Sequence, residues 1–272
     1  LASPFRLHKR GSEMELELAG RTALITGGSK GIGRACAESL AAEGLHLHLA
    51  ARGKEALAET KDKILRNHQV SIETHALDLS DSEAQQELSG RCPDIDILVN
   101  NAGAIPGGTV ASIDEGRWRE AWDLKVFGYI NLCRIFHARM ASRGQGVIVN
   151  VIGLAGEAFN AGYIAGSTGN AGLMAFTRAL GSTSLDDGVR VVGVNPGLVE
   201  TGRMVTLMEQ RAEAEFGDKS RWRDLTTNLP AGRAAKPEEV ANLVTFLASE
   251  RAAYTTGVIY SIDGGVAARH GL

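Results

Sequence analysis

The sequence predicts an α/β domain whose parallel sheet is covered by helices on both faces. Short apolar runs alternate along the chain with longer segments of helical spacing. Of 272 residues, 44% are hydrophobic and 22% are charged, which fits a globular core and excludes disorder, collagen and a coiled coil. The 33 glycines exceed the usual share, and with only 6 prolines they do not form a linker. We expect them where the backbone tolerates no side chain.

Seven apolar runs are predicted to be strands, and four segments between them to be helices. The strands are expected at residues 22–26, 45–51, 70–77, 95–99, 146–152, 189–194 and 258–262. The helices are expected at 33–44, 54–67, 115–142 and 169–185. Right-handed crossovers between parallel strands then give a doubly wound, seven-stranded parallel sheet. The polar segment 203–229 interrupts the alternation and is expected to be a lid over a ligand.

The remaining chain features set the expected organisation and location. The chain starts without Met, and Met14 follows a Gly-Ser junction, so residues 1–13 are expected to be a vector-derived or disordered tail before a single domain, 14–272. No apolar run approaches the ~18 residues that span a bilayer. A net charge of −3 argues against nucleic acid or an anionic membrane as partner. The three scattered cysteines predict neither a disulfide framework nor a zinc site, and they favour a reducing cytoplasm.

A glycine-rich turn lies between the first predicted strand and the helix that follows it. Glycines at 27, 31 and 33 let the backbone approach a pyrophosphate, and a helix N-terminus offers free N–H groups and the positive end of the helix dipole. An ordinary tight turn is the alternative, but the strand–turn–helix context favours a dinucleotide. The predicted contacts are Gly27, Ser29, Lys30, Gly31, Ile32 and Gly33.

The end of the second predicted strand bears on the type of cofactor. An acidic residue there would bind the ribose 2′-hydroxyl of NAD(H), but the chain has Ala51 and Arg52. An arginine can pair with a 2′-phosphate, and Lys30 could add a second positive charge. Both cations could instead be solvated surface residues. The sequence favours NADP(H) over NAD(H).

Several short motifs together resemble the short-chain dehydrogenase/reductase family over roughly residues 16–266. They are the Thr26–Gly33 turn, Asp78, Asn100-Asn101-Ala102-Gly103, Asn195-Pro196-Gly197 with Thr201, and Asp263-Gly264-Gly265. The resemblance implies a Rossmann fold, hydride transfer between a nicotinamide and a small carbonyl or alcohol substrate, and a homo-oligomer, either tetramer or dimer. The further cofactor contacts that it implies are Asp78, Leu79, Asn101, Ala102, Gly103, Pro196, Gly197, Val199 and Thr201.

The positions that carry catalysis in that family are all substituted in this chain. The family uses an Asn-Ser-Tyr-Lys tetrad, and its spacing falls here on Lys125, Gly153, Gly166 and Asn170. An amine and an amide have therefore exchanged places, and Tyr163 lies three residues before the vacant tyrosine position. These substitutions indicate a rearranged active site.

Tyr163, Lys125 and Asn170 are the predicted catalytic residues. Three helical residues turn by about 300° and rise by about 4.5 Å, so the Tyr163 ring could reach the vacant position, where Gly166 leaves room. A free phenol has a pKa near ~10, and Lys125 is expected to lower it for proton transfer. Asn170 is expected to hydrogen-bond the ribose. The alternatives are a packed Tyr163 in a loop and a solvated Lys125.

Other side chains are better explained by structural roles. Ser167 and Thr168 are alternative hydroxyl donors, but helix capping is favoured for both. His46 and His48 alternate on one strand like a metal pair; without an evident third ligand they are expected to be packed histidines, and no metal is expected.

Two alternatives remain for the methionines of the predicted lid, and two for the function of the chain. Met204 and Met208 line a substrate pocket or pack the lid down. The chain is expected to be an oxidoreductase because the amine and the phenol reappear near where they were lost. The alternative is a catalytically silent dinucleotide-binding protein, such as a redox sensor or an oligomer partner.

Overall fold

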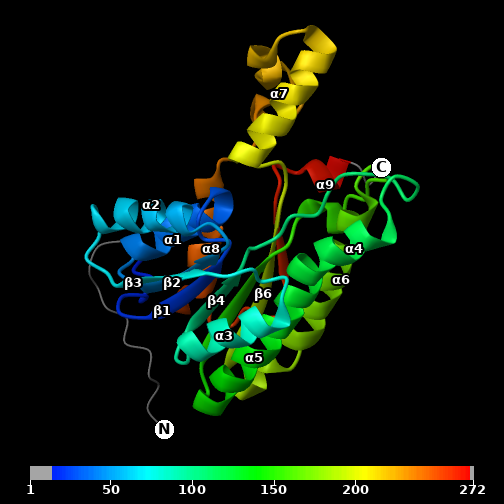
Figure 1. Cartoon of the computed structure of the whole chain (residues 1–272). Coiled ribbons are helices and arrows are strands. Elements are labelled where there is room, and N and C mark those ends of the chain that lie inside the picture. The colour runs from blue at the N-terminus through cyan, green and yellow to red at the C-terminus, as the bar shows by residue number, and fades with distance from the viewer. Residues whose placement is uncertain (1–13, 270–272) are drawn as a thin grey trace.

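The computed structural model describes residues 14–269 and has one parallel sheet at its centre (Figure 1). The seven strands lie in the order β3-β2-β1-β4-β5-β6-β7, so the doubly wound fold predicted from the sequence is confirmed. The strands are β1 Thr22–Thr26, β2 His46–Ala51, β3 Ile72–Ala76, β4 Ile97–Asn100, β5 Gly146–Val151, β6 Val189–Pro196 and β7 Ile259–Ile262. The tail expected at residues 1–13 lies outside the described residues.

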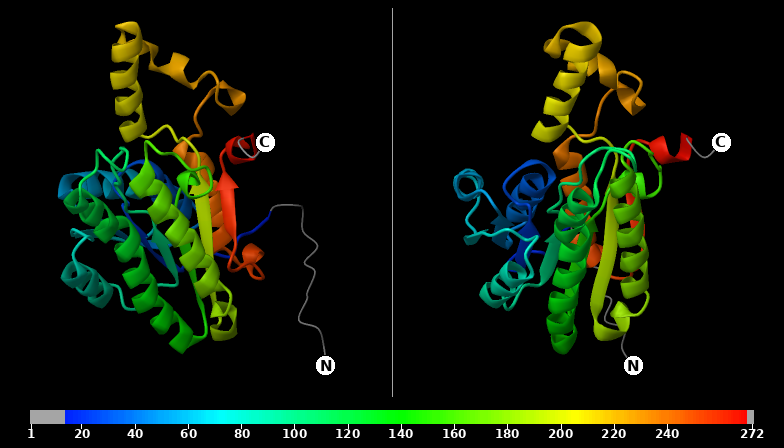
Figure 2. Two further views of the ribbon diagram at one scale, coloured as in Figure 1. Left: turned by 90° about the vertical axis from the view of Figure 1, so that its right-hand side faces the viewer. Right: turned by 45° about the vertical axis from the view of Figure 1, so that its right-hand side comes forward.

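Helices cover both faces of the sheet (Figures 1 and 2). They are α1 Gly31–Ala42, α2 Lys54–Leu65, α3 Ser82–Arg91, α4 Glu115–Trp122, α5 Gly128–Arg143, α6 Ile164–Gly181, α7 Gly202–Phe216, α8 Pro237–Ala248 and α9 Val266–Arg269. Successive strand residues point to opposite faces, so Ile25 packs in the core with α1 and α8 while its neighbour Leu24 packs in the core with α3 and α5. The sheet is thus buried on both sides, as parallel sheets are.

Helices α3, α8 and the short α9 were not predicted from the sequence, α7 lies in the segment expected to be a lid, and α6 begins earlier than predicted. Helix α3 is mostly polar and buries only Gln85, Leu88 and Ser89. Helix α8 has a proline at its first position and a strong apolar face, and both are sequence signals of a helix. Helix α6 begins at Ile164 rather than at 169, and its early glycines concealed its start.

The segment predicted as one long helix, 115–142, is a helix interrupted by a π-turn. Helix α4 runs into a π-helical turn at Asp123–Phe127, and α5 follows directly. A π-turn inserts one extra residue, and such turns are frequent at functional sites. Lys125 lies within this turn and is buried, so it is not a solvated helix cation.

The segment expected to be a lid stands away from the sheet beyond the carboxyl ends of the strands (Figures 1 and 2). It consists of α7 and a 3₁₀ stretch, Lys219–Thr226, packed on each other around a small core of their own. That core contains Met204, Ala212, Trp222 and Ala234. No helix among residues 14–269 has the length and apolar character needed to cross a membrane.

Candidate active site

A cleft of about 1310 Å³ opens where the strands end, beside the switch between β1 and β4. This is where open parallel sheets bind their ligands. Most of the residues predicted from the sequence line it: Gly27, Ser29, Lys30, Gly31, Ile32, Arg52, Leu79, Asn101, Ala102, Gly103, Lys125, Tyr163, Asn170, Pro196, Gly197, Val199 and Thr201. Gly33 and Asp78 do not line it. Gly33 packs behind the glycine turn, and Asp78 lies beside Arg52.

The glycine turn forms one wall of the cleft. Lys30 occupies the N-cap of α1 and makes no side-chain capping bond, so the first N–H groups of the helix are left for a ligand. Gly33 permits the tight packing behind this wall, because a Cβ there would lie 2.3 Å from the Gly27 carbonyl oxygen and 2.4 Å from Asn101 Nδ2. Gly33 therefore shapes the turn without contacting the cleft.

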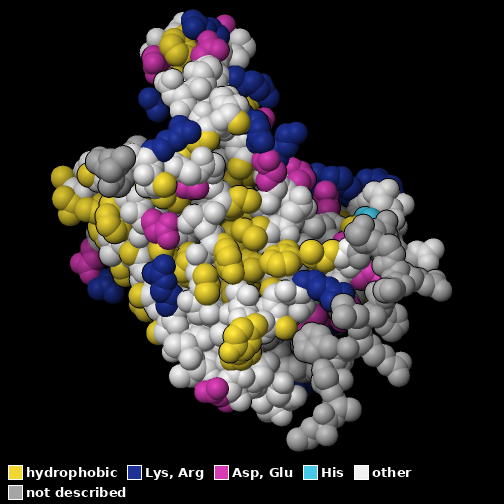
Figure 3. Space-filling model, turned by 180° about the vertical axis from the view of Figure 1, so that it is seen from behind, with side chains coloured by type: hydrophobic (Ala, Val, Ile, Leu, Met, Phe, Trp, Pro, Cys, Tyr) yellow, Lys and Arg dark blue, Asp and Glu magenta, His cyan; other side chains and the backbone are white. Residues whose placement is uncertain are grey.

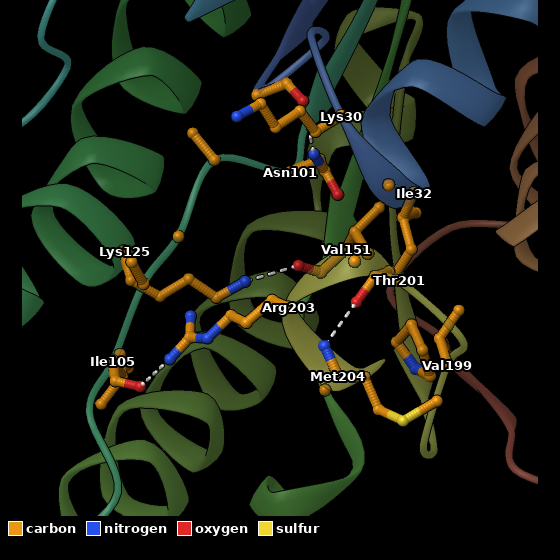
Figure 4. Close-up of a pocket in the computed structure, with 18 of the residues that line it drawn as sticks. Lys30, Ile32, Asn101, Ile105, Lys125, Val151, Val199, Thr201, Arg203 and Met204 are labelled. Atoms are coloured by element: carbon orange, nitrogen blue, oxygen red, sulfur yellow. Dashed lines mark hydrogen bonds between the residues drawn. The ribbon is translucent and has the colours of Figure 1, made fainter. Parts of the chain in front are cut away.

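A hydrogen-bond bracket joins the end of β1 to the loop after β4. Thr26 Oγ1 accepts from the backbone N–H of Asn101 at 2.9 Å and of Ala102 at 3.0 Å. The Asn101 amide returns bonds to the carbonyl oxygens of Thr26 at 3.1 Å and Gly27 at 3.3 Å. The two loops are thus held at a fixed separation, with Asn101 beside Lys30 and Ile32 in the cleft wall (Figure 4). The free N–H groups at the start of α1 and the fixed loop after β4 together fit an anionic dinucleotide.

Arg52 lies at the β2 end of the cleft with its side chain 69% exposed. Its guanidinium is 3.8 Å from the Asp78 carboxylate, which also accepts hydrogen bonds from Ser80. Partial burial raises the pKa of Asp78, but the Ser80 hydrogen bonds and the Arg52 charge lower it by more, and the net shift is downward. Asp78 is thus an ionised partner that holds Arg52 near the cleft.

Lys125 is buried at the opposite end of the cleft with 8% exposure. Its Nζ donates to the Tyr129 hydroxyl at 2.8 Å. It also donates to the Val151 carbonyl oxygen at 2.7 Å (Figure 4). Within residues 14–269 no carboxylate pairs with this amine, and burial lowers its pKa to about 7. Gly103 makes room for it, since a Cβ there would lie 2.4 Å from Lys125 Cδ.

Tyr163 lies directly against Gly166, the position at which the sequence spacing predicts the family's tyrosine. A Cβ on Gly166 would lie 2.0 Å from Tyr163 Cε1, so the phenol ring occupies the space that this glycine leaves. Tyr163 is the N-cap of α6; it packs in part against the core cluster of Ile105 and Ala165 and also lines the cleft. The ring therefore fills the space above Gly166, and its part in catalysis stays a prediction.

The expected partnership between Lys125 and Tyr163 is wrong in one respect. Lys125 gives its hydrogen bonds to Tyr129 and Val151, because the π-turn aims it at the end of β5. Burial raises the pKa of Tyr163, and the positive charge that opposes this shift comes from Arg203. Arg203 lies at the start of α7 and donates to the Ile105 carbonyl oxygen at 2.9 Å (Figure 4).

Asn170 and Gly153, the other two positions that the sequence spacing assigns to the tetrad, lie side by side. Gly153 has φ 142°, and a Cβ there would lie 2.9 Å from Asn170 Nδ2, so the amide fills the space above this glycine. Asn170 is only 4% exposed, and its Oδ1 has no hydrogen-bond partner among the described residues. An unpaired buried acceptor costs about 1–3 kcal/mol, which a ligand hydroxyl would recover. This orphaned oxygen in the cleft wall fits a ribose hydroxyl.

Sequence reasoning missed two functional neighbours, Tyr129 and Arg203. Tyr129 lies four residues after Lys125, a helical spacing that places the two side chains together and that was a usable signal. Arg203 carried no such signal, because its position depends on how the lid meets the body. The two readings of the lid methionines are compatible: Met204 and Met208 both line the cleft and pack within the lid core.

The alternative hydroxyl donors are engaged elsewhere. Ser167 Oγ accepts from the Asn160 N–H at 3.1 Å, and Thr168 Oγ1 donates to the Ile164 carbonyl oxygen at 3.0 Å. Neither lines the cleft, and neither is the N-cap of α6, which is Tyr163. Both residues support the local structure of the helix and the loop before it.

The doubly wound sheet, the uncapped helix and the glycine turn define a dinucleotide-binding α/β protein. A sequence model of the short chain dehydrogenase family matches residues 21–212, and the chain belongs to this family. Its members are NAD(P)-dependent oxidoreductases of carbonyl and alcohol substrates, and that is the class of this protein.

Individual relatives match over nearly the whole chain. The 3-oxoacyl-[acyl-carrier-protein] reductase FabG of Aquifex aeolicus is 32% identical over 93% of this chain and 100% of its own. The 2-keto-3-deoxy-L-fuconate dehydrogenase of Xanthomonas campestris pv. campestris is 31% identical over 91% of this chain and 80% of its own. The structure of L-sorbose reductase from Gluconobacter frateurii, complexed with NADPH and L-sorbose, is 31% identical, with a TM-score of 0.87 over 93% of this chain and 99% of that chain.

Proposed function

We propose that this protein is an NADP(H)-dependent oxidoreductase that interconverts a small carbonyl compound and its alcohol through a rearranged active site. The observation that carries the proposal is the Tyr163 ring against Gly166, in the same cleft wall as Lys125 and Asn170. A phenol, an amine and an amide thus stand together although all four tetrad positions are substituted.

Each of these side chains has a defined task in carbonyl reduction. Bound NADPH supplies a hydride to the carbonyl carbon. Tyr163 donates its phenol proton to the carbonyl oxygen, and the nearby charge of Arg203 stabilises the phenolate that results. Lys125, whose pKa is about 7, exchanges protons near neutral pH and returns a proton to the cleft after each turnover. Asn170 Oδ1 accepts a hydrogen bond from a ribose hydroxyl.

The preference for NADP(H) rests on the charges at the end of β2. Arg52, which is largely exposed, directly follows Ala51 at the end of β2 where an acidic residue would bind the ribose of NAD(H), so a 2′-phosphate would meet its guanidinium, which Asp78 holds near the cleft. Lys30, also in the cleft wall, adds a second positive charge. The L-sorbose reductase structure, a relative of the same fold, contains NADPH.

The assembly and location of the protein are part of the same proposal. Apolar side chains gather in a band on the face opposite the view of Figure 1 (Figure 3). The exposed apolar residues near β7, the edge strand, are Phe246, Tyr254 and Val258. Such a surface favours a homo-oligomer, a tetramer or a dimer. The free thiols of Cys36, Cys92 and Cys133 favour the cytoplasm.

The test compares the full chain with Tyr163→Phe on a panel of carbonyl compounds with NADPH and of alcohols with NADP⁺. A general acid contributes about 10²–10⁴-fold, so the variant should lose at least ~100-fold in kcat/KM while its Kd for NADPH changes little. A loss below tenfold would remove Tyr163 as the acid. Tight NADPH binding by the wild type without turnover of any panel member would favour the catalytically silent alternative.

A further inference from the structure

A second cluster of reactive side chains lies outside the cleft. His48 on β2, His75 on β3 and Cys92 at the C-cap of α3 place their ligand atoms within 4.8 Å of one another. None of the three lines the cleft. The sequence analysis paired His48 with His46, but His46 accepts a hydrogen bond from the Ser71 N–H, and the true neighbours of His48 come from segments far along the chain.

The spacing of these donor atoms matches a tetrahedral metal site. His48 Nδ1 is 3.0 Å from His75 Nε2, and Cys92 Sγ is 3.5 Å from the same His75 atom. With Zn–N distances of about 2.0–2.1 Å and Zn–S of about 2.3 Å, tetrahedral geometry separates two nitrogens by about 3.3 Å and nitrogen from sulfur by about 3.6 Å. The two separations that involve His75 Nε2 are thus close to those values, and His48 Nδ1 lies within 4.8 Å of Cys92 Sγ.

Hydrogen bonding alone explains this arrangement poorly. His75 Nε2 carries either one proton or one lone pair, yet both His48 Nδ1 and Cys92 Sγ lie against it. His75 is 3% exposed and Cys92 is fully buried, so water cannot serve the Cys92 thiol when the half-buried His48 takes that one position. A cation at the point where the three atoms converge would satisfy all of them at once.

Burial sets the protonation of the three ligand side chains. Burial lowers the pKa of both histidines, which keeps their nitrogens available as ligands. Burial also raises the pKa of the Cys92 thiol to about 12, and a bound metal would replace that proton. The other charged groups that face the cluster are Glu73, Glu87, Arg91 and Arg139.

Glu73 is placed to supply a fourth ligand. It pairs in register with His48 across the β2–β3 ladder, and its Oε2 lies 3.9 Å from His48 Nδ1. It also precedes His75 by two residues, so both side chains lie on the same side of β3. Its side chain is 69% exposed and can turn toward the cluster from solvent.

We propose that His48, His75 and Cys92 bind one Zn²⁺ ion, with Glu73 as the fourth ligand. Two imidazoles, a thiolate and a carboxylate are ligands that zinc prefers, and four protein ligands make a closed structural site. The ion links β2 to β3, which is the outer strand of the sheet, and to the end of α3. Its role is to fasten this edge of the domain.

The test is titration of the full chain, stripped with a chelator, with Co²⁺ as a spectroscopic substitute for Zn²⁺. We expect one Co²⁺ per chain and a near-ultraviolet charge-transfer band from a thiolate ligand. Cys92→Ala should abolish the band. Cys36→Ala should keep it, since Cys36 is an equally buried thiol on α1, remote from the cluster.

Two further variants test the ligands His48 and Glu73, which are less buried than His75, so their substitution leaves no cavity in the core. Even the indirect partners of a metal contribute about 10–100-fold to affinity, so His48→Gln should weaken Co²⁺ binding by at least about 100-fold. Glu73→Gln, at an exposed position, should weaken it by at least about tenfold with an unchanged circular dichroism spectrum. Zn²⁺ should raise the Tm of the wild type and of Cys36→Ala by the same amount, and at the same Zn²⁺ concentration it should raise the Tm of the two ligand variants by less.

The proposal is overturned if the wild type shows no thiolate band with Co²⁺. It is also overturned if the band survives in Cys92→Ala, or if His48→Gln and Glu73→Gln, both folded, bind Co²⁺ as tightly as the wild type.

Discussion

The amine of Lys125 is buried without a carboxylate partner, and this has a consequence for stability. Burial lowers its pKa from 10.5 to about 7, so between these values the unfolded chain binds a proton that the folded chain does not. Stability from this group therefore rises with pH through that window and is lost as pH falls toward 7. Between pH 7 and pH 9 the gain is about 2 kcal/mol.

Lys125→Met removes this titration and should abolish that part of the pH dependence. Urea unfolding at pH 7 and pH 9 measures it, and Lys63→Met, on the exposed side of α2, is the control that should keep the wild-type slope. Equal slopes in the wild type and Lys125→Met would show that the amine keeps its ordinary pKa.

Gly166 is the residue on which the position of Tyr163 depends. In Gly166→Ala the new Cβ would lie 2.0 Å from the phenol ring, so the ring must leave its place. We expect the reductase activity to fall at least ~100-fold, as in Tyr163→Phe, with NADPH binding retained. Gly172→Ala on the same helix meets nothing within 4 Å and should keep full activity while gaining about 0.5–1 kcal/mol in stability. Full activity in Gly166→Ala would mean that Tyr163 is not used where it now lies.

Arg52 should decide the choice between the two cofactors. A hydrogen bond to a charged group is worth about 1.5–3 kcal/mol, so Arg52→Ala should raise the Kd for NADPH by roughly 10- to 150-fold. The Kd for NADH should change by less than threefold. Arg66→Ala, past the end of α2, tests whether mere loss of surface charge has the same effect. An equal loss for both cofactors would place the role of Arg52 outside 2′-phosphate recognition.

At the scale of elements, the strands were predictable because their apolar runs are short and bounded by glycine or polar residues. The predicted strand 22–26 coincides with β1, and the other strands differ at their ends. Helix α3 was not predictable by periodicity, since its buried face includes Gln85 and Ser89. Helix α8 was predictable from Pro237 and Glu239, which begin it, and from its apolar face.

The π-turn could not have been predicted, yet it determines what Lys125 does. Sequence spacing placed Lys125 at the vacant asparagine position and near Tyr163, and the cleft does contain both. The extra residue in the turn directs the amine to Tyr129 and Val151. The positive charge near the Tyr163 phenol, which was expected from Lys125, comes from Arg203. The position of Arg203 depends on the contact between the lid and the loop after β4. Local spacing predicts which residues meet at the cleft, whereas long-range packing decides which of them touch.

At the scale of the whole molecule, the β7 edge of the sheet is the surface on which we expect copies of the chain to assemble. The β7 edge of the sheet has unpaired backbone groups, and Val258 beside it is 41% exposed. An apolar side chain at a sheet edge is a poor surface for a monomer and a good one for a second copy of the chain. We expect light scattering after size exclusion to give the mass of two or four chains. Val258→Glu should shift the protein toward smaller species, because the carboxylate would be buried at the contact.

Leu65→Glu is the matched control for this prediction. Leu65 ends α2, on the other side of the molecule from β7, and its exposure of 40% is nearly that of Val258. This variant carries the same new charge at a site outside the proposed contact, so it should keep the mass of the wild type. A wild type that runs as a monomer at all concentrations would contradict the proposed oligomer. A loss of assembly in both variants would show that charge alone, and not the β7 edge, controls it.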